Sequence, residues 1–243
     1  MIIFRVFLLL VLSTSAFSDE DSLLRSCEIK DIECLSKSTE QFLEKTCKGI
    51  PEYDIRAIDP LEIPSLVHKL TDDGSISLHF KNLRITGLKN QKISDFQMDK
   101  ATKSVLLKLN VDLNIVGEIT IESSKMSKPF SGMYSAKATT LATANYEYDL
   151  TTDSKGVQHF KVLPERISCE IVGEPEVSIS DDLLQSLQKE ESSKEWQSKN
   201  IKKQKEFREK TICKLVEKAY VTVVHNIRAA AKFLPANAFF KDI

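Results

Sequence analysis

The segment SVLLKLNVDLNIVGEITIE, residues 104–122, contains the clearest strand signal in the chain. Apart from Gly117, one of its two faces is aliphatic throughout, and its aliphatic residues are Val105, Leu107, Leu109, Val111, Leu113, Ile115, Ile119 and Ile121. Because side chains alternate between the two faces of a strand, this pattern predicts one strand over residues 105–121. At about 3.3 Å per residue the strand is ~55 Å long, and a strand of that length must coil around whatever it covers.

A second strand of similar length is predicted over residues 133–150, which include the segment ATANYEYDL at positions 142–150. Its inward face is mostly small and ends in two phenols. The residues on it are Tyr134, Ala136, Ala138, Thr140, Ala142, Ala144, Tyr146, Tyr148 and Leu150. Such alanines either let a helix approach closely or leave room for an apolar ligand, and the pattern alone leaves both readings open.

Shorter segments complete the predicted sheet. Residues 156–164 together with 167–171 alternate as a third strand, and residues 74–85 alternate with a phase slip after Phe80 that indicates a bulge. The three prolines within residues 51–64 exclude a long helix or a central strand and indicate an extended connector.

Two helices are predicted beside these strands. Residues 212–234 place apolar side chains at i, i+3 and i+4 without interruption, which indicates a long amphipathic helix. Residues 31–47 indicate a shorter helix that Asp31 caps and Gly49 terminates. Residues 181–209 are so rich in charge that we expect a mobile or solvated segment there.

The economical assembly of these parts is an α+β fold, in which a strongly curved antiparallel sheet wraps the long C-terminal helix and buries both apolar faces at once. Cys169, at a strand end, and Cys213, in the first turns of the helix, are placed to join the two elements. Cys27 and Cys34 are close enough to pin the first segment to the shorter helix. If these pairs form, Cys47 remains as a buried free thiol.

The N-terminal residues 1–18 have the pattern of a secretory signal peptide, with an apolar block from Val6 to Leu12 that is too short to span a bilayer. We therefore expect a secreted, disulfide-bonded single domain of residues 19–243. The 34 basic and 35 acidic residues nearly cancel, so the overall charge attracts neither nucleic acid nor an anionic membrane. No stable membrane insertion is expected.

No recognised catalytic or metal-binding motif is present in the sequence. It contains no G-x-S-x-G, H-E-x-x-H, P-loop or glycine-rich dinucleotide fingerprint, and its four histidines are scattered singly. We therefore expect no metal, no cofactor and no enzymatic activity. Because Ser, His and Asp side chains can converge in space without a motif, a secreted ester hydrolase remains an alternative.

Four segments resemble the insect haemolymph juvenile hormone-binding proteins and their takeout-like relatives. They are CLSKSTEQFLEKTCKGIPEYDIRAIDPLEI at 34–63, FKNLRITGLKNQKISDFQMD at 80–99, GEPEVSIS at 173–180 and VVHNIRAAAKFLPANAFF at 223–240. The resemblance covers essentially all of residues 19–243. Two cysteine pairs, where the takeout-like branch usually keeps only the N-terminal one, favour the hormone-binding branch.

The resemblance implies a long helix wrapped by a curved sheet, a tunnel for a sesquiterpenoid epoxide ester, and N-terminal helices that close over the ligand as a gate. It places the hydroxyl that donates to the epoxide on Tyr146. By face and size, Phe42, Ala144, Tyr148 and Tyr220 are expected to line the tunnel.

The implied function is a carrier, expected to be monomeric, that transports juvenile hormone in haemolymph and protects it from hydrolysis. The alternative within the same fold is a takeout-like carrier of another lipid or an odorant.

Overall fold

The computed structural model describes residues 23–243. The expected signal peptide lies outside these residues and stays a prediction. The long strand predicted first is β4 (Ser104–Ser123), which pairs antiparallel with β5 (Phe130–Thr152) over almost its whole length. The register places Val105 opposite Tyr146 and Ile121 opposite Phe130, so the aliphatic face of β4 lies beside the small residues of β5.

The other strands divide the outer edges of this central pair. Along β4, one edge is shared end to end by β2 (Ile76–Thr86) and β3 (Lys92–Asp99), and β1 (Leu61–Lys69) continues the sheet beyond β2. Along β5, the other edge is shared by β6 (Gln158–Val162) and β7 (Arg166–Ile179). All pairs are antiparallel, which confirms the predicted antiparallel sheet, but the single third strand expected over residues 156–164 and 167–171 is two strands, β6 and β7, that pair with different parts of β5.

The bulge predicted after Phe80 is present, because the β2 to β4 register shifts between Lys81 and Arg84. Pro64 lies inside β1, an outermost strand of the sheet, where the missing N–H of proline breaks no ladder between two neighbours. The proline-rich connector also contains a short 3-10 helix, η1 (Pro51–Tyr53).

Between β2 and β3 the chain crosses close over the middle of β4. The crossing consists of Gly87, the 3-10 helix η2 (Leu88–Asn90) and Gln91. A Cβ atom on Gly87 would lie 2.1 Å from the carbonyl oxygen of Asp112, and Gly87 has a φ of +108°. Glycine is therefore required for both reasons, and the crossing falls where neither β2 nor β3 pairs with β4.

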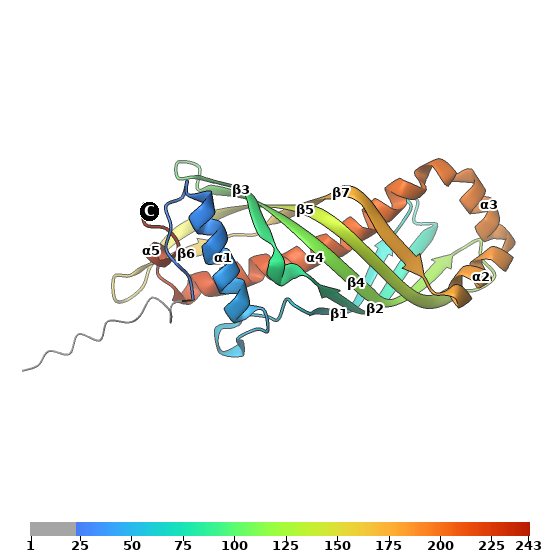
Figure 1. The fold of residues 1–243 in the computed structure, drawn as a ribbon, viewed down its shortest axis with the longest axis horizontal. Coiled ribbons are helices and arrows are strands. Elements are labelled where there is room, and N and C mark those ends of the chain that lie inside the picture. Colours follow the sequence, from blue (N-terminus) through green and yellow to red (C-terminus); the bar gives the residue numbers. More distant parts are fainter. Residues whose placement is uncertain (1–22) are drawn as a thin grey trace, which may run out of the picture.

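The long helix is α4 (Gln204–Phe233), and it runs along the inside of the curved sheet (Figure 1). Its inward residues are almost completely buried and include Ile212, Leu215, Val216, Ala219 and Tyr220. The helix begins eight residues before the apolar pattern because its first two turns carry i, i+4 ion pairs, such as Lys205 with Glu209. The α+β wrap predicted from the sequence is confirmed.

Residues 181–209 were expected to be a mobile or solvated segment leading into the long helix; they do lead into it and are mostly exposed, but they are helical. The chain forms α2 (Asp181–Lys189), α3 (Glu191–Lys199) and a 3-10 turn, η3 (Ile201–Lys203), before α4. Leu183 and Leu187, four residues apart on α2, are buried against the sheet. Trp196 packs on Phe207 with ring centroids 5.3 Å apart, so a few apolar contacts hold this charged segment.

The N-terminal helix is α1 (Ile32–Thr46), and the Asp31 side chain accepts a hydrogen bond from the backbone N–H of Cys34, as the capping prediction requires. In the structure Cys27 is bonded to Cys34 and Cys169 to Cys213, while Cys47 is buried and unbonded. A four-residue helix, α5 (Ala236–Phe239), follows α4. Figure 1 shows α1 and α5 at one end of the molecule and α2 and α3 at the other.

Candidate functional site

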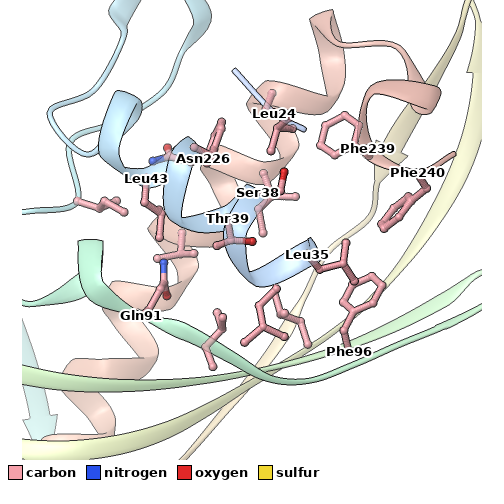
Figure 2. A pocket seen from close by; sticks show the side chains of 18 of the residues that line it. Leu24, Leu35, Ser38, Thr39, Leu43, Gln91, Phe96, Asn226, Phe239 and Phe240 are labelled. Carbon is pink, nitrogen blue, oxygen red and sulfur yellow. The ribbon is translucent and has the colours of Figure 1, made fainter. Parts of the chain in front are cut away.

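A largely apolar cavity of about 140 Å³ lies between α1, the last third of α4 and the inner face of the sheet (Figure 2). Both helices contribute one face at helical spacing. From α1 these residues are Leu35, Ser38, Thr39, Phe42 and Leu43, and from α4 they are Val223, Asn226, Ile227 and Ala230. The sheet contributes Ile93, Phe96, Leu107, Leu109 and Tyr146, and the remaining lining residues are Leu24, Ile58, Gln91, Phe239 and Phe240.

The segment before α1 folds back onto the helix and fixes that wall. The hydroxyl of Ser38 donates to the carbonyl of Arg25 at 2.7 Å and accepts from the Arg25 N–H at 3.0 Å. Cys27 exchanges backbone hydrogen bonds with the C-terminal segment, donating to Phe239 at 3.3 Å and accepting from Lys241 at 2.8 Å. The N-terminal segment, α1 and the C-terminus therefore form one cover over the cavity.

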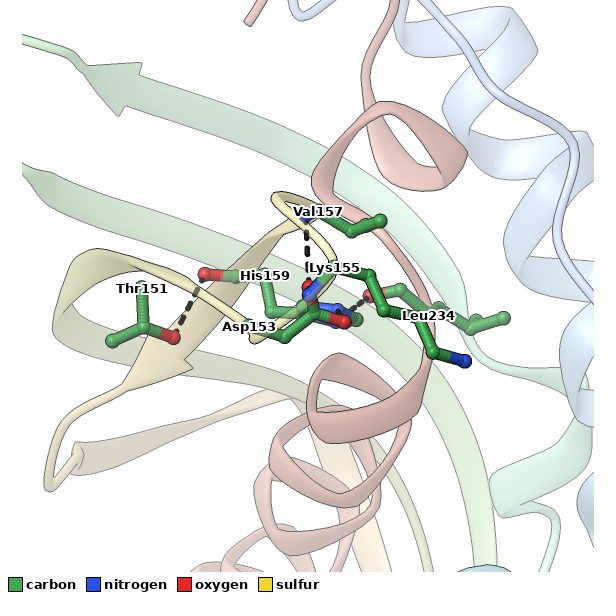
Figure 3. Close-up of polar contacts among 6 residues, drawn as sticks. All are labelled: Thr151, Asp153, Lys155, Val157, His159 and Leu234. Carbon is green, nitrogen blue, oxygen red and sulfur yellow. Dashed lines mark hydrogen bonds and ion pairs between the residues drawn. The ribbon is translucent and has the colours of Figure 1, made fainter.

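The C-terminal segment is also held from the opposite side. The Nδ1 of His159 on β6 lies 3.0 Å from the carbonyl oxygen of Leu234, at the end of α4 (Figure 3). In the turn between β5 and β6 the Asp153 carboxylate accepts hydrogen bonds from the N–H groups of Val157 and Lys155, and these hold the pKa of Asp153 below its usual value. This contact positions the chain just before Phe239 and Phe240 enter the cavity wall.

Tyr146 contributes a phenol to the cavity from the end of β5. The residue is partly buried, and its hydroxyl forms no side-chain hydrogen bond with a residue of the described chain. Burial raises the pKa of its hydroxyl far above the usual range, because the charged phenolate is poorly solvated there. At physiological pH the group is thus a neutral O–H that can donate to a bound molecule.

Among the other residues expected to line a tunnel, Phe42 lines this cavity, whereas Ala144, Tyr148 and Tyr220 do not. Tyr148 lies in a smaller cluster with Ala144, and its ring meets Phe160 edge-on at 5.2 Å. Tyr220 is 1% exposed on α4, and its hydroxyl is buried without a partner among residues 23–243. Their roles as ligand contacts stay predictions.

The alanines of β5 are buried, and none of them lines the cavity. The free volume lies closer to α1 than to this stripe of small residues. In this structure the alanines therefore serve close packing, and the room for a ligand comes from the gap between α1 and α4.

Two amide side chains in the cavity wall were not singled out from the sequence. Asn226, 3% exposed, donates to the carbonyl of Arg56 at 2.8 Å and accepts from its N–H at 2.9 Å, so it clasps the connector. Gln91 is 1% exposed, and its carbonyl oxygen has no hydrogen-bond partner among the described residues. The sequence offered one indication that Gln91 faces the interior: it lies two residues before the inward-facing Ile93, in the same strand phase.

The cavity favours an uncharged apolar molecule with a few hydrogen-bond acceptors. Within residues 23–243, no Asp, Glu, His, Lys, Arg or Cys lines it, and no cluster of three or more potential metal-ligating side chains occurs. The same residues include no helix long and apolar enough to cross a membrane. Binding and shielding of a ligand are the chemistry that this lining can perform.

Comparison with known proteins gives three consistent findings. Residues 6–185 match the family described as haemolymph juvenile hormone binding protein. The juvenile hormone-binding protein of Manduca sexta is 52% identical over 226 residues, which cover 93% of this chain and 99% of that protein. The crystal structure of Epiphyas postvittana Takeout 1 aligns with a TM-score of 0.73 at 16% identity, over 89% of this chain and 99% of that one. At this low identity the likeness concerns the fold alone.

Proposed function

The chain belongs to the haemolymph juvenile hormone binding protein family, and we propose that it carries juvenile hormone in the cavity between α1 and α4. The observation that supports this most directly is the composition of the cavity wall. It is uncharged and mostly apolar, and it contains the unpartnered hydroxyl of Tyr146. A sesquiterpenoid with an epoxide and a methyl ester offers apolar surface and acceptors, but no charge and no donor, which matches that wall.

Burial of apolar surface supplies most of the binding free energy in this proposal. A hormone of this size exposes roughly 400 Å² of apolar surface, worth on the order of 10 kcal/mol when buried. Loss of translational and conformational freedom takes back several kcal/mol. One hydrogen bond from Tyr146 to the epoxide adds about 1 kcal/mol, so its main effect is to orient the ligand and to discriminate against molecules without the acceptor.

The cavity must widen to admit the hormone. Its volume of about 140 Å³ is below the ~300–1,000 Å³ usual for small-molecule sites. We propose that α1 moves as the gate, because it contributes one whole wall of the cavity and is joined covalently only through the chain and the Cys27 to Cys34 bond. Closure over the ligand would shield its ester and epoxide from hydrolases.

The remaining features of the proposal concern the protein as it circulates. We propose a secreted, monomeric, single-domain carrier formed by residues 19–243, with no enzymatic activity. Secretion into haemolymph is supported by the family and by two disulfide bonds, which persist in an oxidising compartment.

Equilibrium binding of juvenile hormone and of an analogue without the epoxide oxygen tests the proposal. Tyr146→Phe is expected to weaken hormone binding about tenfold and to leave the deoxy analogue unaffected, because only one ligand loses a hydrogen bond. Tyr53→Phe removes the hydroxyl of a tyrosine that is 47% exposed and serves as the matched control.

Equal losses for both ligands, or no loss, would remove Tyr146 from this role. Failure of the wild-type protein to bind the hormone would overturn the proposed function itself. Mass spectrometry of small molecules extracted from protein purified from its source distinguishes the alternative, since a fatty acid or an odorant in place of the terpenoid would identify a different carrier.

A further inference from the structure

The side-chain carbonyl oxygen of Gln91 is a hydrogen-bond acceptor that the fold leaves unused. Gln91 is 1% exposed and lines the cavity, and this oxygen has no partner among the described residues. By contrast, the side chains of Ser38 and Asn226 in the same wall each donate to and accept from one backbone segment. A buried acceptor without a donor lowers the stability of the fold, so a bound molecule that supplies a donor would remove that cost.

The hydroxyl of Tyr146, a free donor in the same wall, lies at a different level of the sheet. Tyr146 pairs with Val105 of β4. Lys92, the residue after Gln91, pairs with Asn110 of the same strand. Five residues of β4 separate these two levels, which corresponds to about 17 Å between backbones. The phenol donor and the amide acceptor therefore border one cavity at separate points and do not satisfy each other.

The backbone around Gln91 holds its side chain in place. The N–H of Gln91 donates to the carbonyl of Leu88 at 3.3 Å, and the crossing that contains it is fixed at Gly87, where no side chain fits over β4. Figure 2 shows the Gln91 side chain extending from this turn toward α1. The acceptor is thus carried by a constrained turn, as a positioned ligand contact requires.

The charge of the cavity wall determines which kind of donor fits beside this acceptor. Within residues 23–243 no charged side chain lines the cavity, so an ammonium group would be buried there without a counter-ion. A hydroxyl is a donor without charge, and an apolar chain attached to it would match the rest of the wall.

We propose that the cavity also takes an apolar alcohol, a terpenoid or long-chain molecule whose hydroxyl donates to the carbonyl oxygen of Gln91. Tyr146 then donates to an acceptor at the other end of the same molecule. This inference goes beyond the proposed function, because the hormone described there has no donor, and it rests on that function only for the location of the site. A ligand without the hydroxyl leaves the Gln91 oxygen unpaired, so the contact discriminates between the two kinds of ligand.

The test uses the hormone skeleton with its epoxide retained for Tyr146 and its ester group replaced by either CH₂OH or CH₂F. Fluorine is close to a hydroxyl in size but cannot donate, so the ratio of the two affinities reports the donated hydrogen bond. Gln91→Met keeps the length of the side chain and removes the acceptor. It is expected to lower the ratio of alcohol to fluoride affinity about tenfold, through weaker binding of the alcohol. Gln185→Met, the same change at an exposed position of α2, should keep the wild-type ratio.

The outcomes separate this inference from the function that locates the site. An unchanged ratio in Gln91→Met, or an equal loss of affinity for both ligands, overturns it. Urea unfolding verifies that the variant is folded. If Gln91→Met does not fold, Gln91→Asn, which withdraws the amide by one methylene group, should lower the ratio in the same direction, and an unchanged ratio there refutes the contact. If wild-type protein binds the hormone but not the alcohol, this inference fails alone; if it binds neither, the proposed function fails as well.

Discussion

Filling the cavity from α4 tests whether the space between α1 and α4 is the binding site. Ala230 lines the cavity and is 1% exposed, so Ala230→Leu adds three carbon atoms to a wall that borders empty space. The same substitution at Ala219 adds them to a position of the same helix that is 0% exposed and does not line the cavity. The two variants therefore differ in whether room exists for the new side chain.

The expected magnitudes follow from the cavity volume. An empty cavity of about 140 Å³ lowers the free energy of unfolding by roughly 3 kcal/mol, at ~24 cal/mol per Å³ of cavity. Three carbons buried at ~0.8 kcal/mol each recover up to about 2.4 kcal/mol, and strain from imperfect fit removes part of that gain. We expect the free energy of unfolding of Ala230→Leu to rise by about 1 kcal/mol. The new side chain takes up space that the ligand would fill, so the ligand loses up to about 2.4 kcal/mol of binding free energy, which corresponds to a roughly 50-fold weaker affinity.

Urea unfolding and equilibrium hormone binding measure the two effects on the same preparations. Ala219→Leu is expected to lower the free energy of unfolding by about 1–3 kcal/mol through overpacking and to keep its affinity. Full hormone affinity in Ala230→Leu would show that the ligand binds elsewhere. Destabilisation of Ala230→Leu as large as that of Ala219→Leu would show that the cavity offers no usable space.

Three further predictions follow from the structure. Replacing Cys169 and Cys213 together by serine should lower the free energy of unfolding in urea by about 4 kcal/mol, because the bond closes a loop with a sequence separation of 44; a loss below about 1 kcal/mol would contradict this. Gly87→Ala should lower the free energy of unfolding in urea by at least about 3 kcal/mol, because Gly87 combines a positive φ with a position where a Cβ atom clashes with the backbone. Gly156 has a positive φ in open space, so Gly156→Ala should lower it by only about 1 kcal/mol. Equal losses in the two variants would refute the clash. The carboxylic acid of the hormone should compete at least ~100-fold more weakly than the ester at pH 7, because no cation lines the cavity within residues 23–243. Its affinity should recover as the pH falls below about 4–5 and the acid becomes neutral. Equal competition by acid and ester at pH 7 would mean that a cation reaches the ligand.

The parts of the fold that were predictable from the sequence are those with an unbroken period. β4, β5 and α4 each keep one apolar phase over many residues, and all three appear where expected. β3 was missed because its apolar residues, Ile93, Phe96 and Met98, do not follow a single period of two. The bulge between Ile93 and Asp95 shifts the phase, and only the β4 ladder reveals the strand.

Helices α2 and α3 were missed for a different reason. Charged side chains dominate their composition, and their stability depends on a few tertiary contacts, such as those of Leu187 and Trp196, which have no local signature.

The site was predictable only in part, because its location depends on where α1 packs. Phe42 and Tyr146 were selected from the sequence and do line the cavity, while Ala144 and Tyr220 face the interior elsewhere. Inward orientation can be derived from strand and helix periods. Which inward residues border free space is decided by the docking of α1, a tertiary contact that no residue pattern encodes. Gln91 was not predicted as a lining residue because a polar residue in a polar turn is normally exposed to solvent.

The division of one edge of β4 between β2 and β3 has a consequence for how the molecule opens. No ladder joins β2 to β3, so they are connected only through β4 and the crossing at Gly87. α1 packs mainly against β3 and η2 rather than against β1 and β2. We expect α1 and β3 to exchange their amide hydrogens as one local cooperative unit, while the β1 and β2 end stays protected until global unfolding. The order of the strands would thus confine the conformational work of ligand uptake to one end of the protein.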